Sequence, residues 1–151
     1  MNAAFNDFPA DDFDADKVPL FPVEPPDGRR DWSEADRQAT LRRLMTQACF
    51  QGVHWPIPNA GKRNPAKARQ EGIRAGVFDT EWQWNYGQAW VELKGYDARG
   101  RAGKLRPEQI CWGNSMHRMG KRVACFFDPY AAFTWLVDTC GAPCLAREGV
   151  R

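Results

Sequence analysis

The 151-residue chain is long enough for one globular domain with a buried core, and its 43% hydrophobic content excludes a wholly disordered protein. The net charge of +2 is spread unevenly, because residues 1–31 hold eight of the 19 acidic residues but only three of the 21 basic ones. No apolar run approaches the length of a membrane-spanning helix, and five cysteines without a secretory leader indicate a reduced compartment. We therefore expect a soluble, single-domain protein with a basic body.

Residues 1–31 form the first predicted segment, an acidic and proline-rich tail. Prolines at 19, 22, 25 and 26 and a cluster of aspartates predict a disordered segment that builds no core. An acidic tail beside a basic body could cover a nucleic-acid-binding surface when that surface is empty, and the alternative is a solvated tail with no regulatory role. We expect the folded domain to cover residues 32–140 and a second tail to cover residues 141–151.

Hydrophobic periodicity and end signals predict alternating helices and strands in the body. Ser33 suits the N-cap of the first helix, Pro65 and Pro107 suit the first turn of two later helices, and residues 85–87 carry turn chemistry between two strands. The predicted helices cover residues 33–50, 65–72, 107–119 and 129–139, and the predicted strands cover residues 53–57, 77–84, 88–95 and 121–127. This order predicts an α/β domain with a sheet flanked by helices.

The two strands around the turn should pair as a hairpin with charged residues on one face. A turn centred between Asn85 and Tyr86 sets Asp79 opposite Glu92. A turn centred one residue later sets Asp79 opposite Lys94. Both registers put the three charged side chains on the same face, because side chains along a strand alternate with a period of two. The other face is predicted to be apolar and to carry Phe78, Val91 and Leu93.

Asp79 and Glu92 are candidates for holding a hard cation. Directly opposed side chains on one face have Cβ atoms about 4.5–5.5 Å apart, close enough for two carboxylates to share an ion. Mg²⁺ prefers such oxygen ligands, and Lys94 adds an ammonium beside them. This set can hydrolyse a phosphodiester. The alternative is an ordinary amphipathic hairpin whose charged face is solvated.

The hairpin and its flanking segments occur in an order that resembles the VRR-NUC family, the virus-type replication and repair nucleases of the PD-(D/E)XK superfamily. The matching segments are Glu34 with Gln38, Asn59 to Arg63, Gly76 to Asp79, Glu92 with Lys94, and Arg106 to Gln109. One departure is visible, since the proline that precedes the aspartate in the family is Phe78 here. The resemblance spans residues 33–138 and implies a restriction-endonuclease-like PD-(D/E)XK core of order αβ(α)ββαβα, a mixed sheet flanked by helices.

The resemblance also implies a role for each hairpin residue. Asp79, Glu92 and the backbone carbonyl of Leu93 would hold Mg²⁺ or Mn²⁺ as ligands. Lys94 would orient the attacking water or neutralise the charge that develops on the phosphate. The hairpin is therefore expected to be the catalytic centre.

Two helices are expected to complete the site. Glu34 would be a further acid that binds a metal water or a second ion; a capping role at its helix N-terminus is the alternative, and Asp36 could take its place. Gln109 would reach the site from the helix at residues 107–119 and hold the lysine or the scissile phosphate. Its alternative is a surface glutamine.

Two basic stretches flank the proposed site in sequence and are candidates for phosphate contacts. Such contacts position nucleic acid without reading its bases, and they weaken as salt rises. A plain solvated charge run is the alternative. The residues expected to bind nucleic acid are Lys62, Arg63, Arg74, Arg101, Lys104 and Arg106.

Four aromatic residues follow the same hairpin, namely Trp82, Trp84, Tyr86 and Trp90. They could stack on bases at a branch point. Edge packing or a dimer surface is the favoured alternative.

The expected function is that of a divalent-metal-dependent DNA endonuclease. Small members of the family resemble Holliday-junction resolvases that act as homodimers, so a symmetric dimer that cuts branched DNA in replication, recombination or repair is the favoured role. The alternatives are a nuclease for flaps, nicks or single strands, and a DNA-binding accessory subunit without turnover. The family resemblance favours the cytoplasm of a bacterial or phage-infected cell.

Overall fold

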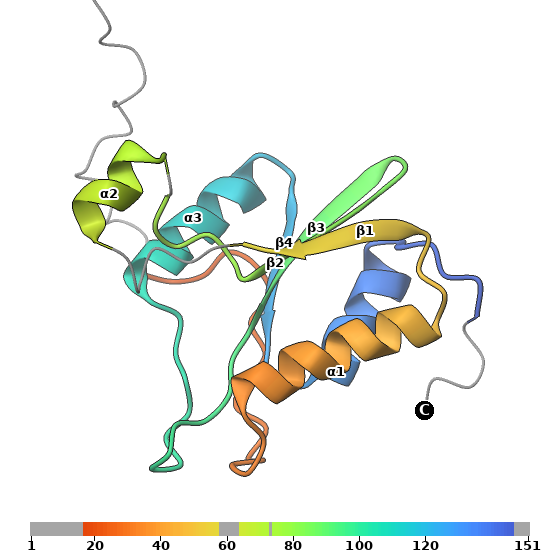
Figure 1. Cartoon of the computed structure of the whole chain (residues 1–151), viewed down its shortest axis with the longest axis horizontal. Helices are drawn as coiled ribbons and strands as arrows, with labels where there is room; N and C mark the ends of the chain where they lie inside the picture. The colour runs from red at the N-terminus through yellow and green to blue at the C-terminus, as the bar shows by residue number, and fades with distance from the viewer. Residues whose placement is uncertain (1–16, 58–63, 73, 147–151) are drawn as a thin grey trace, which may run out of the picture.

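The computed structural model describes residues 17–57, 64–72 and 74–146, and Figure 1 shows its elements in chain order. The helices are α1 (Glu34–Gln47), α2 (Pro65–Gln70), α3 (Pro107–Arg118) and α4 (Pro129–Thr134), which continues as the π-helical turn η3 (Trp135–Thr139). The strands are β1 (Gly52–Pro56), β2 (Thr80–Trp84), β3 (Gly87–Leu93) and β4 (Arg122–Phe126). Within these described ranges, no helix has the length and apolarity that crossing a membrane requires.

The four strands form one mixed sheet in the order β1-β2-β3-β4. β1 pairs with β2 and β2 with β3 in antiparallel fashion, while β3 and β4 are parallel and are joined through α3. The parallel pair needs this crossover because its strands run in the same direction. The predicted α/β class, a mixed sheet flanked by helices, is confirmed.

The β2–β3 register decides between the two predicted hairpins. Trp84 pairs with Gly87, so Asn85 and Tyr86 form a two-residue turn. Continued by one residue beyond the pair of Thr80 with Val91, this register sets Asp79 opposite Glu92. The first of the two alternatives is therefore correct.

Each face of the sheet is covered by helices, as Figure 1 shows. α1 and α4 lie on one face, where Leu41 and Leu136 pack with Val91 and Leu93. α3 lies on the other face, and its Trp112 joins a second apolar cluster. The charged side of the hairpin is consequently enclosed between the sheet and α3.

Phe78 departs from its predicted place. It lies in the second cluster, with its ring 4.9 Å from that of Trp112, on the α3 side of the sheet. It precedes the first residue of β2, so the alternation of a strand does not apply to it. The prediction that Phe78 shares the face of Val91 and Leu93 is wrong.

Residues 17–31, here called the strap, are packed on the domain and contradict the predicted disordered tail in this part. Phe21 is only 4% exposed, and a Cβ added to Gly113 would lie 2.3 Å from its ring. Val23 forms a parallel bridge with Cys125 at the open edge of β4. The strap is therefore held by one buried side chain, Phe21, and by backbone pairing with β4. Residues 1–16 lie outside the described part of the chain.

The predicted C-terminal tail is also packed as far as residue 146. Phe50 and Cys144 form an antiparallel bridge, and the Gln51 N–H donates to the carbonyl of Pro143 at 2.8 Å. Ala142 is fully buried in the core cluster. The domain therefore extends beyond both boundaries predicted from sequence, 32 and 140.

Candidate functional site

The base of the β2–β3 hairpin brings Asp79, Glu92 and Lys94 together. The Asp79 N–H donates to Glu92 Oε2 at 3.1 Å, and Lys94 Nζ donates to Glu92 Oε1 at 2.6 Å. Glu92 is 1% and Lys94 8% exposed. The carboxylate and the ammonium are thus held in one geometry away from bulk water, rather than on a solvated face.

Gln109 joins this network from the first turn of α3. Its Nε2 donates to Glu92 Oε1 at 2.5 Å, while its Oε1 accepts from Lys94 Nζ at 3.1 Å and from the Arg106 N–H at 3.0 Å. Gln109 is buried, so the alternative of a surface glutamine is wrong. One amide spans both members of the ion pair and the start of its own helix.

Gly76 explains how the chain before Asp79 reaches α3. Its φ of +86° lies in the left-handed region, and an added Cβ would lie 2.2 Å from the carbonyl oxygen of Glu108. Only glycine fits both conditions. The loop at Gly76 therefore packs directly against the first turn of α3, which also carries Gln109.

Glu34 approaches from the N-terminus of α1. Its carboxylate accepts a hydrogen bond from the Gly95 backbone, and a Cβ added to Gly95 would lie 2.6 Å from the Glu34 nitrogen. Asp36 is exposed and bonds the N-cap Ser33 instead. Glu34 is therefore the acid from α1 that faces the hairpin. Glycine directly after Lys94 was a sequence signal for this contact that the motif alone did not reveal.

Gln38 is a second contact from α1. Its Nε2 donates to Asp79 Oδ2 at 3.1 Å. The helix-one pair of Glu34 and Gln38 thus faces the carboxylates of the hairpin. We refer to Glu34, Asp79, Glu92, Lys94 and Gln109 together as the hairpin cluster.

The electrostatics of the hairpin cluster are dominated by excess negative charge. Burial, together with the nearby Glu92 and Glu34 carboxylates, raises the pKa of Asp79 to about 7 even though Lys94 opposes the shift. Burial also raises the pKa of Glu34 above its ordinary value. Three carboxyl groups share one buried ammonium, so a further cation would be favourable here.

Oxygen atoms for such a cation come from side chains and backbone. In the described ranges, no three His, Cys, Asp or Glu side chains are already gathered as a metal cage. The Lys94 N–H donates to the carbonyl of Phe126 in β4. The Leu93 carbonyl belongs to the same planar trans peptide group and points the opposite way, toward the β2 side of the sheet that carries Asp79. Two carboxylates, this carbonyl and water form a hard donor set that suits Mg²⁺ or Mn²⁺.

The residues predicted to contact nucleic acid are only partly placed near the cluster. Arg106 is exposed at the start of α3, and its positive charge partly offsets the raised pKa of Glu34. Arg74 is exposed two residues before Gly76 in the chain. Lys104 is exposed at a hollow of about 420 Å³ beside the strap. Lys62 and Arg63 lie outside the described residues.

Arg101 is less available than its sequence position suggests. Its Nε lies 2.7 Å from Asp97 Oδ2, and the same aspartate accepts from the Arg101 N–H. Part of its charge therefore stabilises the loop between β3 and α3.

The aromatic series of the hairpin is mostly interior. Trp82 and Trp90 are buried on opposite faces of the sheet, and His54 stacks on Trp82 with ring centroids 4.4 Å apart. Trp84 is half-buried, whereas Tyr86 is exposed. The four aromatic residues therefore cannot all stack on bases. Only the residues near the turn, Trp84 and Tyr86, are exposed enough to contact a partner.

Comparisons of this chain with protein-family models, with curated proteins and with solved structures give no match.

Proposed function

We propose that this protein is a divalent-metal-dependent DNA endonuclease with a restriction-endonuclease-like PD-(D/E)XK core. The observation that carries the proposal is the hairpin cluster, in which buried Glu92 and Lys94 lie beside the half-buried carboxyl groups of Asp79 and Glu34. A protein that only needed a stable sheet would gain little from this set, because buried like charges repel. A cation and a phosphodiester would both find partners here.

Asp79, Glu92 and the Leu93 carbonyl are the proposed metal ligands, with Glu34 as a further acid. Bound Mg²⁺ or Mn²⁺ would supply the Lewis acid that polarises a phosphoryl oxygen and activates water. The raised pKa of Asp79 fits this role, since a carboxyl group crowded by two others releases its proton when a cation compensates the charge. Gln38 keeps one Asp79 oxygen oriented.

Lys94 and Gln109 are the proposed positioning and charge-stabilising groups. The ammonium bonds Glu92 and Gln109, so its place is fixed before substrate arrives. A preorganised positive charge stabilises negative charge that develops on a phosphate without reorganising the site. Gln109 fixes both partners from a rigid helix.

Branched DNA cut by a homodimer is the favoured substrate and assembly. Arg106, which is exposed beside Glu34, and Arg74, which is exposed five residues before Asp79 in the chain, would contact phosphates on either side of the scissile bond. Such contacts predict binding that tolerates sequence and weakens with salt. Two sites related by a two-fold axis would match a four-way junction.

The test is cleavage of a labelled four-way junction and of a matched linear duplex, with Mg²⁺, Mn²⁺ or EDTA. We expect metal-dependent cuts at paired positions in the junction, and a loss of at least about 100-fold in rate for Lys94→Met. Methionine keeps the apolar stem of the lysine but removes its charge. Lys17→Met, which changes an exposed lysine of the strap, is the matched control and should cut normally.

Three other results would redirect the proposal. Cleavage of the linear duplex as fast as the junction would leave the nuclease but remove the resolvase role. Binding without cleavage in any metal would identify a DNA-binding accessory protein. Full activity of a folded Lys94→Met protein would show that the hairpin cluster is not the catalytic centre.

A further inference from the structure

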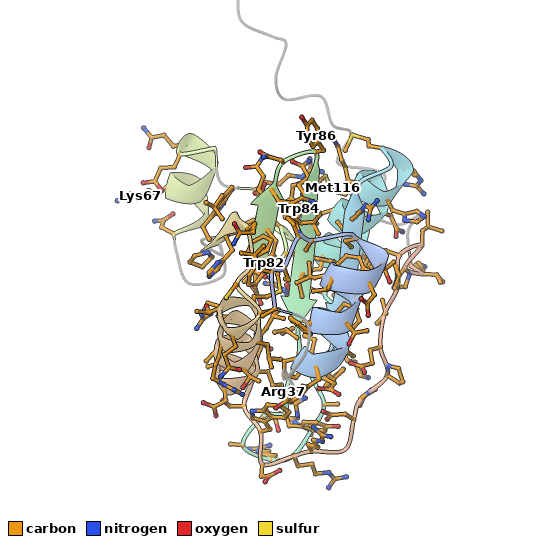
Figure 2. All side chains as sticks on the ribbon, turned by 90° about the vertical axis from the view of Figure 1, so that its right-hand side faces the viewer. Arg37, Lys67, Trp82, Trp84, Tyr86 and Met116 are labelled. Atoms are coloured by element: carbon orange, nitrogen blue, oxygen red, sulfur yellow. The ribbon has the colours of Figure 1, made fainter. Side chains whose placement is uncertain are left out.

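The turn of the β2–β3 hairpin carries an exposed aromatic ring in a strained position. Tyr86 is fully exposed, and Figure 2 shows it at the opposite end of the molecule from Arg37. Its φ of +67° lies in the left-handed region, where glycine is the relaxed choice. Glycine at this position would relieve the backbone strain of the turn. Because the Tyr86 ring is fully exposed, packing inside the protein does not explain its presence. An exposed ring at a strained backbone position is therefore a candidate for a contact outside the chain.

A hollow beside the turn has the charge and lining for a nucleotide. It measures about 430 Å³ and lies between the hairpin and the start of β4. Its lining residues include two aromatic ones, Trp84 and Tyr86, and two basic ones, Lys121 and Arg122, and none of them is acidic. Arg122 Nη1 donates to the carbonyl of Thr139, which holds the guanidinium in place.

We propose that this hollow, here called the tip site, binds a single-stranded arm of DNA. Tyr86 would stack on a base, and Lys121 and Arg122 would contact the adjoining phosphates. Positive charge beside an exposed ring complements a nucleotide, whose phosphate is anionic and whose base has a flat face. The choice of DNA rests on the function proposed above, but binding at the tip site does not require cleavage.

The position of the tip site sets a length requirement. Asp79 lies five residues before Trp84, and a strand rises about 3.4 Å per residue, so these two residues are about 17 Å apart. A stacked strand also advances about 3.4 Å per nucleotide. An arm needs about five nucleotides or more beyond the scissile bond to reach Tyr86.

The experiment measures the affinity of DNA with single-stranded arms of 3, 6 and 10 nucleotides in EDTA, for unmutated protein and two variants. Tyr86→Gly removes the ring and relaxes the turn, so folding should be preserved. Tyr86→Trp keeps a ring. We expect the unmutated protein and Tyr86→Trp to bind the 10-nucleotide arm roughly five- to 100-fold more tightly than Tyr86→Gly does, with no difference for the 3-nucleotide arm.

A charge variant gives an independent readout. Lys121→Ala should lower the slope of log affinity against log salt by about 0.7, the value for one lost phosphate contact on a single strand. Equal binding of long arms by Tyr86→Gly and unmutated protein would overturn the proposal, as would equal losses in the Gly and Trp variants. Because EDTA prevents cleavage, an inactive protein that passes this test would keep its tip site while the nuclease proposal fails.

Discussion

Two buried charge clusters of this molecule have opposite electrostatic balance. At the strap, the Arg37 guanidinium is 0% exposed and makes a two-pronged contact with Asp27, at 2.6 and 3.2 Å. It also donates to the carbonyls of Arg29, Trp32 and Phe127 and lies 4.9 Å from the centre of the Trp32 ring. One cation meets one anion, and further acceptors satisfy the remaining donors.

The hairpin cluster holds more negative charge than its lysine can compensate. Although burial works in the other direction, hydrogen bonds from Arg37 and from the Arg29 N–H lower the pKa of Asp27. The pKa of Asp79 is instead raised to about 7. The paired acid of the strap favours its ionised form, whereas the crowded acid of the hairpin cluster favours its protonated form. Under the proposed function, this difference in charge balance would separate a structural cluster from a metal site.

Removing Arg37 should have the largest effect on stability. Arg37→Met leaves Asp27 without its cation and deprives three carbonyls of a donor, so we expect a loss of about 3–5 kcal/mol in the free energy of unfolding. Denaturant unfolding measures it. Arg43→Met changes an exposed arginine of the same helix and should stay within about 0.5 kcal/mol of the unmutated protein. A similar loss in both variants would assign the effect to helix α1 rather than to the strap.

Neutralising Asp79 should raise the free energy of unfolding, whereas removing Arg37 should lower it. Because its pKa is raised from 3.8 to about 7 on folding, the unmutated protein loses stability as pH rises between these values. Asp79→Asn removes that loss, so it should be more stable than the unmutated protein by about 1–2 kcal/mol at pH 8 and not at pH 4, while cleavage disappears. Thermal unfolding at both pH values measures the difference.

Asp97 provides the contrast for this experiment. Hydrogen bonds from Arg101 and Arg99 lower the pKa of its carboxyl group. Asp97→Asn should therefore bring no stabilisation at pH 8. A gain in both variants would indicate relief of general negative charge rather than of crowding in the hairpin cluster.

The sequence was sufficient for the parts of the fold that depend on local pattern. Period-two alternation and a short turn limited the hairpin to two registers, and both brought Glu92 and Lys94 to the face of Asp79. Pro107 set the start of α3 and thereby the reach of Gln109. These residues are specified by their neighbours in the chain.

Contacts between residues far apart in the chain could not be predicted from local sequence patterns. Phe21 and Val23 look like isolated apolar residues among prolines, because their partners Gly113 and Cys125 are about a hundred positions away. The burial of Arg37 has no local signal either, since its acceptors come from separate segments of the chain. The masking hypothesis for the acidic tail now concerns residues 1–16, because removing residues 17–31 would expose Phe21 and β4.

The smallest expected effect is a change in the affinity of the hairpin cluster for a metal ion as the pH changes. A cation at the hairpin cluster must displace the Asp79 proton, so affinity for Mn²⁺ should rise about tenfold between pH 6 and pH 8, around a pKa of about 7. Isothermal titration with Mn²⁺ at the two pH values measures this. In Asp79→Asn no such proton exists, so any remaining binding should change much less with pH. Equal affinity at both pH values in the unmutated protein would mean that Asp79 is not a ligand, and its raised pKa would then reflect crowding alone.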